Sequence, residues 1–294
     1  MKIRLIGVPT FSGSLYSGTE TAPTALRHAG LKDLLRKSNL EVHDLRDISL
    51  PSYLPRHNIA PVRNWPSPRI IWEELINKSQ EIFSLEDFSL ILGGDCSIIT
   101  GTIQGLYNLF RDKVYVICID AHLDALKPSP DTCVGAAAMG LWFLCNHNMF
   151  YNKPAEFNSS NVFVLGTQEN YEENYGISLY SLNNLRLQGI KASVYNLLTK
   201  IPKDSKIFIH FDLDAITKDE LSAVYAPSDN GFSIKEAKEL LSYIVQDSRV
   251  IGMEITEFSA IKDESGTEAK KVVNILSDAL ANLHTGNLKK FHSL

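Results

Sequence analysis

The sequence predicts an α/β fold in which a mostly parallel central sheet is covered by helices on both faces. Short apolar runs rich in β-branched residues recur along the chain, and each is followed by polar or glycine-rich residues and then by a helical pattern. Such runs are typical of strands buried on both faces of a parallel sheet, and their alternation with helices indicates βαβ units. The expected strands span residues 3–8, 89–92, 114–119, 162–165, 207–211 and 249–253.

Helices are expected between and after these strands. Residues 21–38 carry a proline near their start, where a helix N-terminus prefers it, and leucines at helical spacing after it. Ser233 and Glu236 have the spacing of a capping box, which predicts a helix over residues 233–246. Residues 267–284 repeat the apolar pattern of a helix.

Composition limits the class of protein. The chain has 294 residues, of which 44% are hydrophobic and 21% charged, and these near-average values exclude disordered, collagen-like and coiled-coil proteins. The net charge is −5, from 29 basic and 34 acidic residues, so no basic stripe is available for nucleic acid. The apolar runs are too short for a membrane span or a signal peptide. We therefore expect a small-molecule substrate, with neither nucleic acid nor membrane as a partner.

Cysteine usage and linker composition bear on location and domain organisation. Four cysteines are too few for a disulfide scaffold, and their apolar surroundings favour reduced thiols in a cytoplasmic protein.

The proline-rich segment 51–68 is expected to be a surface loop, and the chain contains no internal repeat or low-complexity linker. Residues 1–294 are therefore expected to form a single domain. The cysteines are Cys96, Cys118, Cys133 and Cys145.

Acidic and metal-capable side chains follow four of the expected strands. Ligand sites in open α/β sheets lie beyond the carboxyl ends of the strands, so these side chains are expected to lie at the site. The strands over 89–92, 114–119, 207–211 and 249–253 are followed by Gly93-Gly94-Asp95-Cys96-Ser97, by Asp120-Ala121-His122-Leu123-Asp124, by Asp212-Leu213-Asp214 and by Glu254.

The spacing of these residues predicts a metal site. If residues 120–124 continue extended, Asp120, His122 and Asp124 share one face, and Asp212 and Asp214 share a face for the same reason. Four carboxylates and an imidazole at one place would repel one another without a cation, so one or two divalent metals are expected. With two metals roughly 3.5–4 Å apart, a carboxylate such as that of Asp120 or Asp212 can bridge them. A donor set rich in oxygen with one imidazole suits Mn²⁺, whereas an all-sulfur donor set would indicate zinc.

Structural roles compete with this interpretation for individual residues. An aspartate just after a strand is often only the cap of the next helix, and Asp95 fits that role. His122 alone would be ordinary, and Glu254 is consistent with either a substrate contact or a surface salt bridge. Two alternating acidic clusters at separate strand ends nevertheless favour the metal site.

With these motifs, the chain resembles the arginase/agmatinase/formiminoglutamase (ureohydrolase) family. The combination of D-A-H-x-D with F-D-x-D in this order is highly specific, and the resemblance extends over most of the chain. It implies a three-layer α/β/α fold, a binuclear manganese centre and a homo-oligomer, either a trimer or a hexamer. It also implies hydrolysis of a guanidino, amidino or formimino C–N bond by metal-bound hydroxide. The matching segments are Gly7-Val8-Pro9, Gly18-Thr19-Glu20, Pro23-Thr24-Ala25-Leu26-Arg27, Gly93-Gly94-Asp95-Cys96-Ser97, Asp120-Ala121-His122-Leu123-Asp124, Phe211-Asp212-Leu213-Asp214 and Met253-Glu254-Ile255.

The resemblance also implies roles for individual residues. Asp124 would accept a hydrogen bond from the bridging hydroxide, and Glu254 would face the guanidinium-like end of the substrate. The ligands of one metal would be Cys96, Asp120, Asp124 and Asp212, and those of the other would be Asp120, His122, Asp212 and Asp214.

The chain departs from the family pattern at several of these positions. The family's G-G-D-H-S motif has histidine where this chain has Cys96. A thiolate there would bias the site toward zinc, iron or nickel, whereas a neutral, unligated Cys96 would leave one metal weak or absent. Leu126 and Val134-Gly135 stand where arginases carry asparagine and a His-Gly pair, and the loop 167–171 lacks the arginase acidic pattern. Arginine is therefore not the expected substrate.

Three functions remain open at this point. The leading hypothesis is a C–N hydrolase with two metals and a small substrate. The second hypothesis is an amide hydrolase that binds only the metal at His122. This single metal would act as a Lewis acid on the amide, as in a deacetylase. A third is a non-catalytic family member with a structural or regulatory role. The metal content of the purified protein discriminates among the three.

Overall fold

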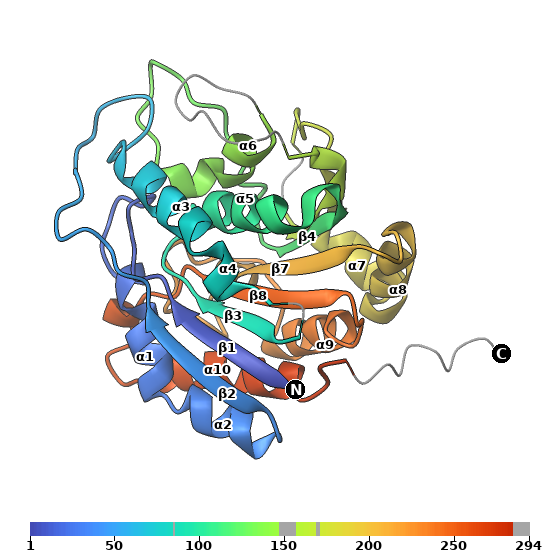
Figure 1. The fold of residues 1–294 in the computed structure, drawn as a ribbon. Coiled ribbons are helices and arrows are strands. Elements are labelled where there is room, and N and C mark those ends of the chain that lie inside the picture. Colours follow the sequence, from blue (N-terminus) through green and yellow to red (C-terminus); the bar gives the residue numbers. More distant parts are fainter. Residues whose placement is uncertain (85, 147–156, 169–170, 285–294) are drawn as a thin grey trace.

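The computed structural model describes residues 1–84, 86–146, 157–168 and 171–284. They form an eight-stranded sheet with the order β2-β1-β3-β8-β7-β4-β5-β6, and every strand pairing among them is parallel (Figure 1). The strands are β1 (Lys2–Gly7), β2 (Glu41–Asp47), β3 (Phe88–Leu92), β4 (Val114–Ile119), β5 (Val162–Thr167), β6 (Ser178–Ser181), β7 (Lys206–Asp212) and β8 (Val250–Thr256).

The six predicted strands are confirmed, and the structure adds the two strands at the edges of the sheet. Strands β3, β4, β5, β7 and β8 are almost entirely buried, which explains why they are visible as apolar runs. β2 has the sequence Glu-Val-His-Asp-Leu-Arg-Asp and only one fully buried side chain, and the four residues of β6 are all half-buried. Edge strands that face solvent do not give a continuous apolar run, so the sequence pattern did not indicate them.

The predicted helices are present with one difference. The single helix expected over 21–38 is two helices, because the chain turns at Gly30, whose φ of 93° is in the left-handed region that favours glycine. The capping box of Ser233 and Glu236 is confirmed, with both reciprocal hydrogen bonds present. The helices are α1 (Ala22–His28), α2 (Leu31–Lys37), α3 (Ser67–Asn77), α4 (Ser79–Ile82), α5 (Ile98–Phe110), α6 (Gly140–Cys145), α7 (Leu182–Gln188), α8 (Ile190–Lys200), α9 (Ile234–Ile244) and α10 (Thr267–Leu280).

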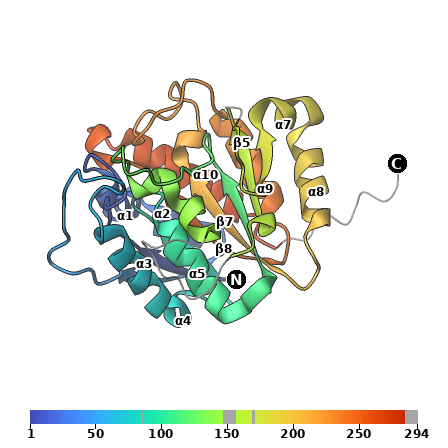
Figure 2. The same cartoon turned by 90° about the horizontal axis from the view of Figure 1, so that it is seen from above.

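The helices form two layers, one on each face of the sheet (Figures 1 and 2). Helices α1, α2, α7, α8, α9 and α10 pack against one face through a core that includes Leu26, Val194 and Leu240. Helices α3, α4, α5 and α6 cover the other face through a second core that includes Ile71 and Ile103. The three-layer α/β/α fold with a parallel central sheet is therefore confirmed.

The predicted loop and cysteine states also agree with the structure. The proline-rich segment 51–68 has no regular helix or strand until α3 begins at Ser67. All four cysteines are free, as expected. No helix in the described part of the chain has the length and apolar character needed to cross a membrane.

Candidate metal centre

The sheet topology brings four of the predicted segments to one place. Strands β3, β8, β7 and β4 are consecutive neighbours at the middle of the sheet, so their carboxyl ends lie side by side. Cys96 lies in the turn between β3 and α5, Asp120 follows β4, Asp212 ends β7 and Glu254 lies within β8. This placement follows the general rule for ligand sites in parallel sheets.

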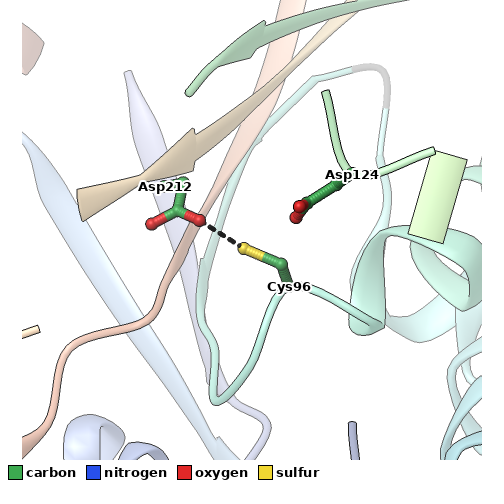
Figure 3. Close-up of side chains that lie close together, drawn as sticks. All are labelled: Cys96, Asp124 and Asp212. Atoms are coloured by element: carbon green, nitrogen blue, oxygen red, sulfur yellow. Dashed lines mark hydrogen bonds between the residues drawn. The ribbon is translucent and has the colours of Figure 1, made fainter. Parts of the chain in front are cut away.

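One candidate ligand cluster consists of Cys96, Asp124 and Asp212 (Figure 3). One potential ligand atom from each lies within 4.8 Å of the others. The Cys96 thiol donates a hydrogen bond to Asp212 Oδ2 at 2.8 Å, and its Sγ lies 3.0 Å from the hydroxyl of Thr256. Three elements that are distant in sequence therefore bring two carboxylates and a thiol to one point.

A second candidate cluster consists of Asp120, His122 and Asp214. His122 Nδ1 lies 3.1 Å from Asp214 Oδ2 and 3.7 Å from Asp120 Oδ1. Both aspartates are buried, whereas the His122 side chain is 43% exposed and is open to the cavity described below. All six predicted metal ligands thus lie in two neighbouring clusters.

The local backbone differs from the predicted extended conformation. Strand β4 ends at Ile119, and the chain bends after it, with a φ of 48° at Asp124. Asp120 Oδ1 accepts a hydrogen bond from the backbone N–H of His122 at 2.6 Å, and Asp212 Oδ1 accepts one from Asp214 at 2.8 Å. The expected residues converge, but they do so through these short side-chain-to-backbone turns because the strand does not continue.

Burial and crowding make the charged forms of these side chains unfavourable. Burial first, and then the charge of a neighbouring aspartate, raises the pKa of Asp120 and of Asp212 to about 7. The same two causes raise the pKa of Asp124 and Asp214 well above the usual range, and they also raise that of the Cys96 thiol. Without a cation, the site would therefore bind protons.

The residues present fit a divalent cation. Asp214 Oδ1 is buried and has no hydrogen-bond partner among the described residues, which normally costs free energy. Carboxylate oxygens with one imidazole are the donors that Mn²⁺ prefers, and a cation would also relieve the repulsion among the four aspartates. The clusters therefore meet the chemical requirements of a divalent metal site.

Two predicted residues occupy positions away from the metal ligands. Glu254 is fully buried, and its Oε1 lies 2.8 Å from His210 Nδ1 on the adjacent strand β7. Burial opposes protonation of His210, but the hydrogen bond and charge of Glu254 outweigh it, so the pKa of His210 is raised. Asp95 accepts hydrogen bonds from the backbone N–H groups of Gly13 and Ser97, so its role is structural, but it is not the cap expected for the next helix, because the N-cap of α5 is Ser97.

Glu257 is a candidate site residue that the sequence motifs did not indicate. It follows β8 directly, with a φ of 65°, and it lines the cavity next to Asp212 and Asp214. Its Oε1 accepts a hydrogen bond from the backbone N–H of Cys96 at 2.7 Å, while its buried Oε2 has no hydrogen-bond partner among the described residues. The only available signal was its position three residues after Glu254, beyond the expected strand over 249–253.

A cavity of about 530 Å³ opens onto both clusters. Metal-ligand candidates and Glu257 form one part of its lining, and the remainder is mostly apolar and aromatic. Leu126 lies on this cavity, as the departure from the arginase pattern implied, whereas Val134 and Gly135 are outside the lining. The described residues of the lining are His122, Leu123, Asp124, Ala125, Leu126, Lys127, Ala137, Ala138, Tyr171, Glu172, Glu173, Tyr175, Asp212, Asp214, Tyr225, Ala226 and Glu257.

A three-layer α/β/α fold with carboxylate-rich clusters at the carboxyl ends of its strands defines an α/β protein with a candidate divalent-metal centre. Residues 1–281 match the sequence model of the Arginase family, and the chain therefore belongs to this family. This membership confirms the predicted class of enzyme, a metal-dependent hydrolase of C–N bonds.

Named relatives and solved structures are similar to this chain over almost its whole length. The chain is 24% identical to the arginase of Bacillus subtilis (strain 168) over 289 residues, which cover 95% of this chain and 97% of that one. The crystal structure of Entamoeba histolytica arginase in complex with L-ornithine has a TM-score of 0.85 at 20% identity, covering 95% and 98% of the two chains. A Trypanosoma cruzi formiminoglutamase variant with Mn²⁺ has a TM-score of 0.76 at 19% identity, covering 96% and 93%.

Proposed function

We propose that this protein hydrolyses a linear C–N bond of a guanidino, amidino or formimino compound with two Mn²⁺ ions. The observation that carries the proposal is the pair of neighbouring ligand clusters at one end of an open cavity. The named relatives include arginases and a formiminoglutamase, which are named for different substrates, so family membership leaves the substrate open. The small-molecule substrate expected from the sequence fits a cavity of this size.

Each metal would be held by one cluster, with two carboxylates shared. Cys96 and Asp124 would bind the first ion, and His122 and Asp214 would bind the second. Asp120 and Asp212 would contact both, and the close approach of these two carboxylates supports this, since the charge of Asp212 contributes to the raised pKa of Asp120. When bound, the ions would supply Lewis-acid activation of water and of the scissile group.

The protein side chains would supply proton transfer and substrate orientation. Asp124 faces the cavity beside Cys96 and Asp212, so its carboxylate would accept a proton from the attacking water and return it to the departing nitrogen. Glu257 lines the same region, and its Oε2 has no hydrogen-bond partner among the described residues. We propose that this carboxylate attracts the cationic guanidinium, amidinium or formiminium group of the substrate. The contact of Glu254 with substrate stays a prediction, since its carboxylate is hydrogen-bonded to His210.

One observation favours a state with a single metal as the second candidate. The Cys96 thiol is buried, donates a hydrogen bond to Asp212, and has its pKa raised first by burial and then by the charge of Asp212. A thiol that keeps its proton is a poor metal ligand, because the thiolate is the coordinating form. Only the ion at His122 would then bind strongly.

Three further features are proposed from the sequence and the family. Residues 1–294 would form one domain, and the protein would assemble as a homo-oligomer, either a trimer or a hexamer. The reduced cysteines favour a cytoplasmic location.

The proposal is tested by metal analysis and turnover on the same preparation. Protein loaded with Mn²⁺ and freed of excess metal is assayed on guanidino, amidino and formimino compounds, and its metal content is measured by elemental analysis. We expect two ions per chain and turnover of at least one compound class. Asp120→Asn should lose both metal and turnover, whereas Asp131→Asn, on an exposed loop residue outside the clusters, should lose neither. Full metal content without any turnover would reject the hydrolase assignment.

A further inference from the structure

The cavity has two chemically different parts. This difference bears on the substrate tail, which is the part of the substrate that does not contain the C–N bond to be hydrolysed. One part presents the carboxylates of Asp124, Asp212, Asp214 and Glu257. The other is formed mostly by leucine, alanine and tyrosine side chains, together with Lys127, Glu172 and Glu173, and no arginine is among the described lining residues. We propose that the substrate carries its cationic amidine or guanidine group on an apolar or aromatic tail without a free carboxylate. This inference rests on the proposed function.

The apolar wall is held in place by backbone hydrogen bonds. Leu126 donates its N–H to the carbonyl of Ala138 at 2.9 Å, and Ala137 donates to the carbonyl of Gly13 at 3.2 Å. Leu126 is nevertheless 50% exposed, so half of its surface is open to the cavity and to water. An apolar tail would remove this side chain from water, and each methylene buried there stabilises binding roughly fourfold.

The aromatic part of the wall is connected to the carboxylate part. The hydroxyl of Tyr225 accepts a hydrogen bond from the backbone N–H of Leu15 at 2.9 Å, which orients the ring. The backbone N–H of Tyr225 donates to the carbonyl of Glu257 at 2.9 Å, so the ring and the carboxylate are held at adjoining positions. Tyr171 and Tyr175 add two further rings to the lining. Three rings beside carboxylates suit a cation that carries an apolar body.

Charges on the lining disfavour an anionic tail. Glu172 and Glu173 are exposed on the cavity, and Lys127 is the one lysine or arginine among the described lining residues. A carboxylate tail would therefore lie near two glutamates and only one cationic side chain, that of Lys127. It would also lack the bidentate arginine partner that carboxylates usually have in a specific site. The amino-acid end of arginine has the same disadvantage.

The inference is tested with compounds that share one head and differ only in the tail. Mn²⁺-loaded protein is assayed with pentylguanidine, 2-phenylethylguanidine, 4-aminobutylguanidine, 4-guanidinobutyrate and arginine, by kcat/KM for urea release and by calorimetric Kd. We expect the two apolar-tailed compounds to exceed the carboxylate-bearing ones at least tenfold in both quantities. An equal or higher value for any charged-tail compound would overturn the inference but would leave the proposed hydrolase function intact.

The binding measurement separates the two claims if no compound is hydrolysed. In that case the proposed function fails for guanidines, and tenfold tighter binding of the apolar-tailed compounds would still support the inference. Absence of any such preference in binding would overturn it.

Variants connect the preference to particular residues. Leu126→Asn should reduce the preference for pentylguanidine over 4-guanidinobutyrate at least fivefold, since the tail would then face an amide. Leu187→Asn is the matched control, because Leu187 is 85% exposed on α7 and outside the cavity lining. The double variant Glu172→Gln/Glu173→Gln should improve 4-guanidinobutyrate selectively. No change in selectivity in either cavity variant would contradict the proposed tail contacts.

Discussion

The thiol of Cys96 lies 2.8 Å from Asp212 Oδ2 and donates a hydrogen bond to it. Cysteine therefore occupies, in space as well as in sequence, a place among the candidate metal ligands. The same hydrogen bond would be lost if the thiolate bound a metal, because coordination requires removal of the proton. Occupancy of the Cys96 cluster is thus expected to depend on pH in a way that distinguishes the two metal models.

Replacement of Cys96 provides the first prediction. If the thiolate is a ligand, metal affinity at this cluster should fall as pH decreases below the raised pKa of the Cys96 thiol, more steeply than carboxylates alone allow. Cys96→Ser should weaken this ion and leave the one at His122 and Asp214 in place, while Cys96→His should raise Mn²⁺ occupancy. Calorimetric metal titrations of both variants check this, with Cys133→Ser, in a half-buried loop position, as the control. Unchanged stoichiometry and affinity in Cys96→Ser would end the thiolate-ligand hypothesis.

The shared carboxylates provide the second prediction. Asp120→Ala and Asp212→Ala should each abolish binding of both metals and all hydrolysis, because the loss of a shared ligand affects both clusters. Asp131→Ala should retain the metals, since Asp131 is exposed and lies outside the clusters. Elemental analysis of the purified variants gives the answer directly. Full occupancy in either shared-ligand variant is incompatible with shared ligation.

The response of stability to pH is the third prediction. Burial and neighbouring carboxylates raise the pKa of Asp120 and Asp212 from 3.8 to about 7 in the metal-free protein. The folded protein binds the protons of these two carboxyl groups more tightly than the unfolded chain does. Their protonation therefore contributes its full stabilisation below about pH 4, and this contribution is lost as pH rises through the folded-state pKa. Mn²⁺ should therefore increase the Tm more at pH 8 than at pH 5. Scanning calorimetry with and without Mn²⁺ measures this, and equal increases at both pH values would argue against binding at these aspartates.

Glu257 gives the fourth prediction. Its buried Oε2 has no hydrogen-bond partner among the described residues. Burial and the charge of Asp212 raise the pKa of Glu257, so a cationic group beside it would favour the carboxylate form, and Glu257→Gln would remove that charge. We expect a loss of kcat/KM of about tenfold or more, the usual scale for a charge-assisted contact. Glu264→Gln, on an exposed residue, is the matched control. A variant with wild-type kcat/KM would show that Glu257 only supports the turn at Cys96.

Arginine provides the fifth prediction. Leu126 offers no polar group to the amino-acid end of arginine, and Glu172 and Glu173 repel its α-carboxylate, so its turnover should be negligible beside that of a compound with a different tail. A kcat for arginine on the order of 10 s⁻¹, typical of working enzymes, would contradict this expectation. Urea release under Mn²⁺ saturation is the measurement.

The sequence predicted the parts of this protein that depend on local pattern. The buried central strands gave apolar runs, and the motifs at their ends identified all six residues of the two clusters. The capping box at Ser233 and Glu236 was visible for the same reason, because it is a contact between residues three apart. These features require no knowledge of how distant segments pack.

Other features depend on long-range packing and were not predictable from pattern. The contact between His210 and Glu254 exists because β7 and β8 pair in the register that places these residues opposite each other. Glu257 reaches the site through a backbone conformation after β8 that no motif specified. The bend after Asp120 likewise replaced the expected extended segment, although the same side chains converge.

Metal stoichiometry of the wild-type protein tests the central claim most directly. Protein loaded with Mn²⁺, freed of excess metal and measured by elemental analysis is predicted to hold two ions per chain. One ion per chain would contradict ligation at the Cys96 cluster, and the absence of stoichiometric metal would contradict the metal centre as a whole.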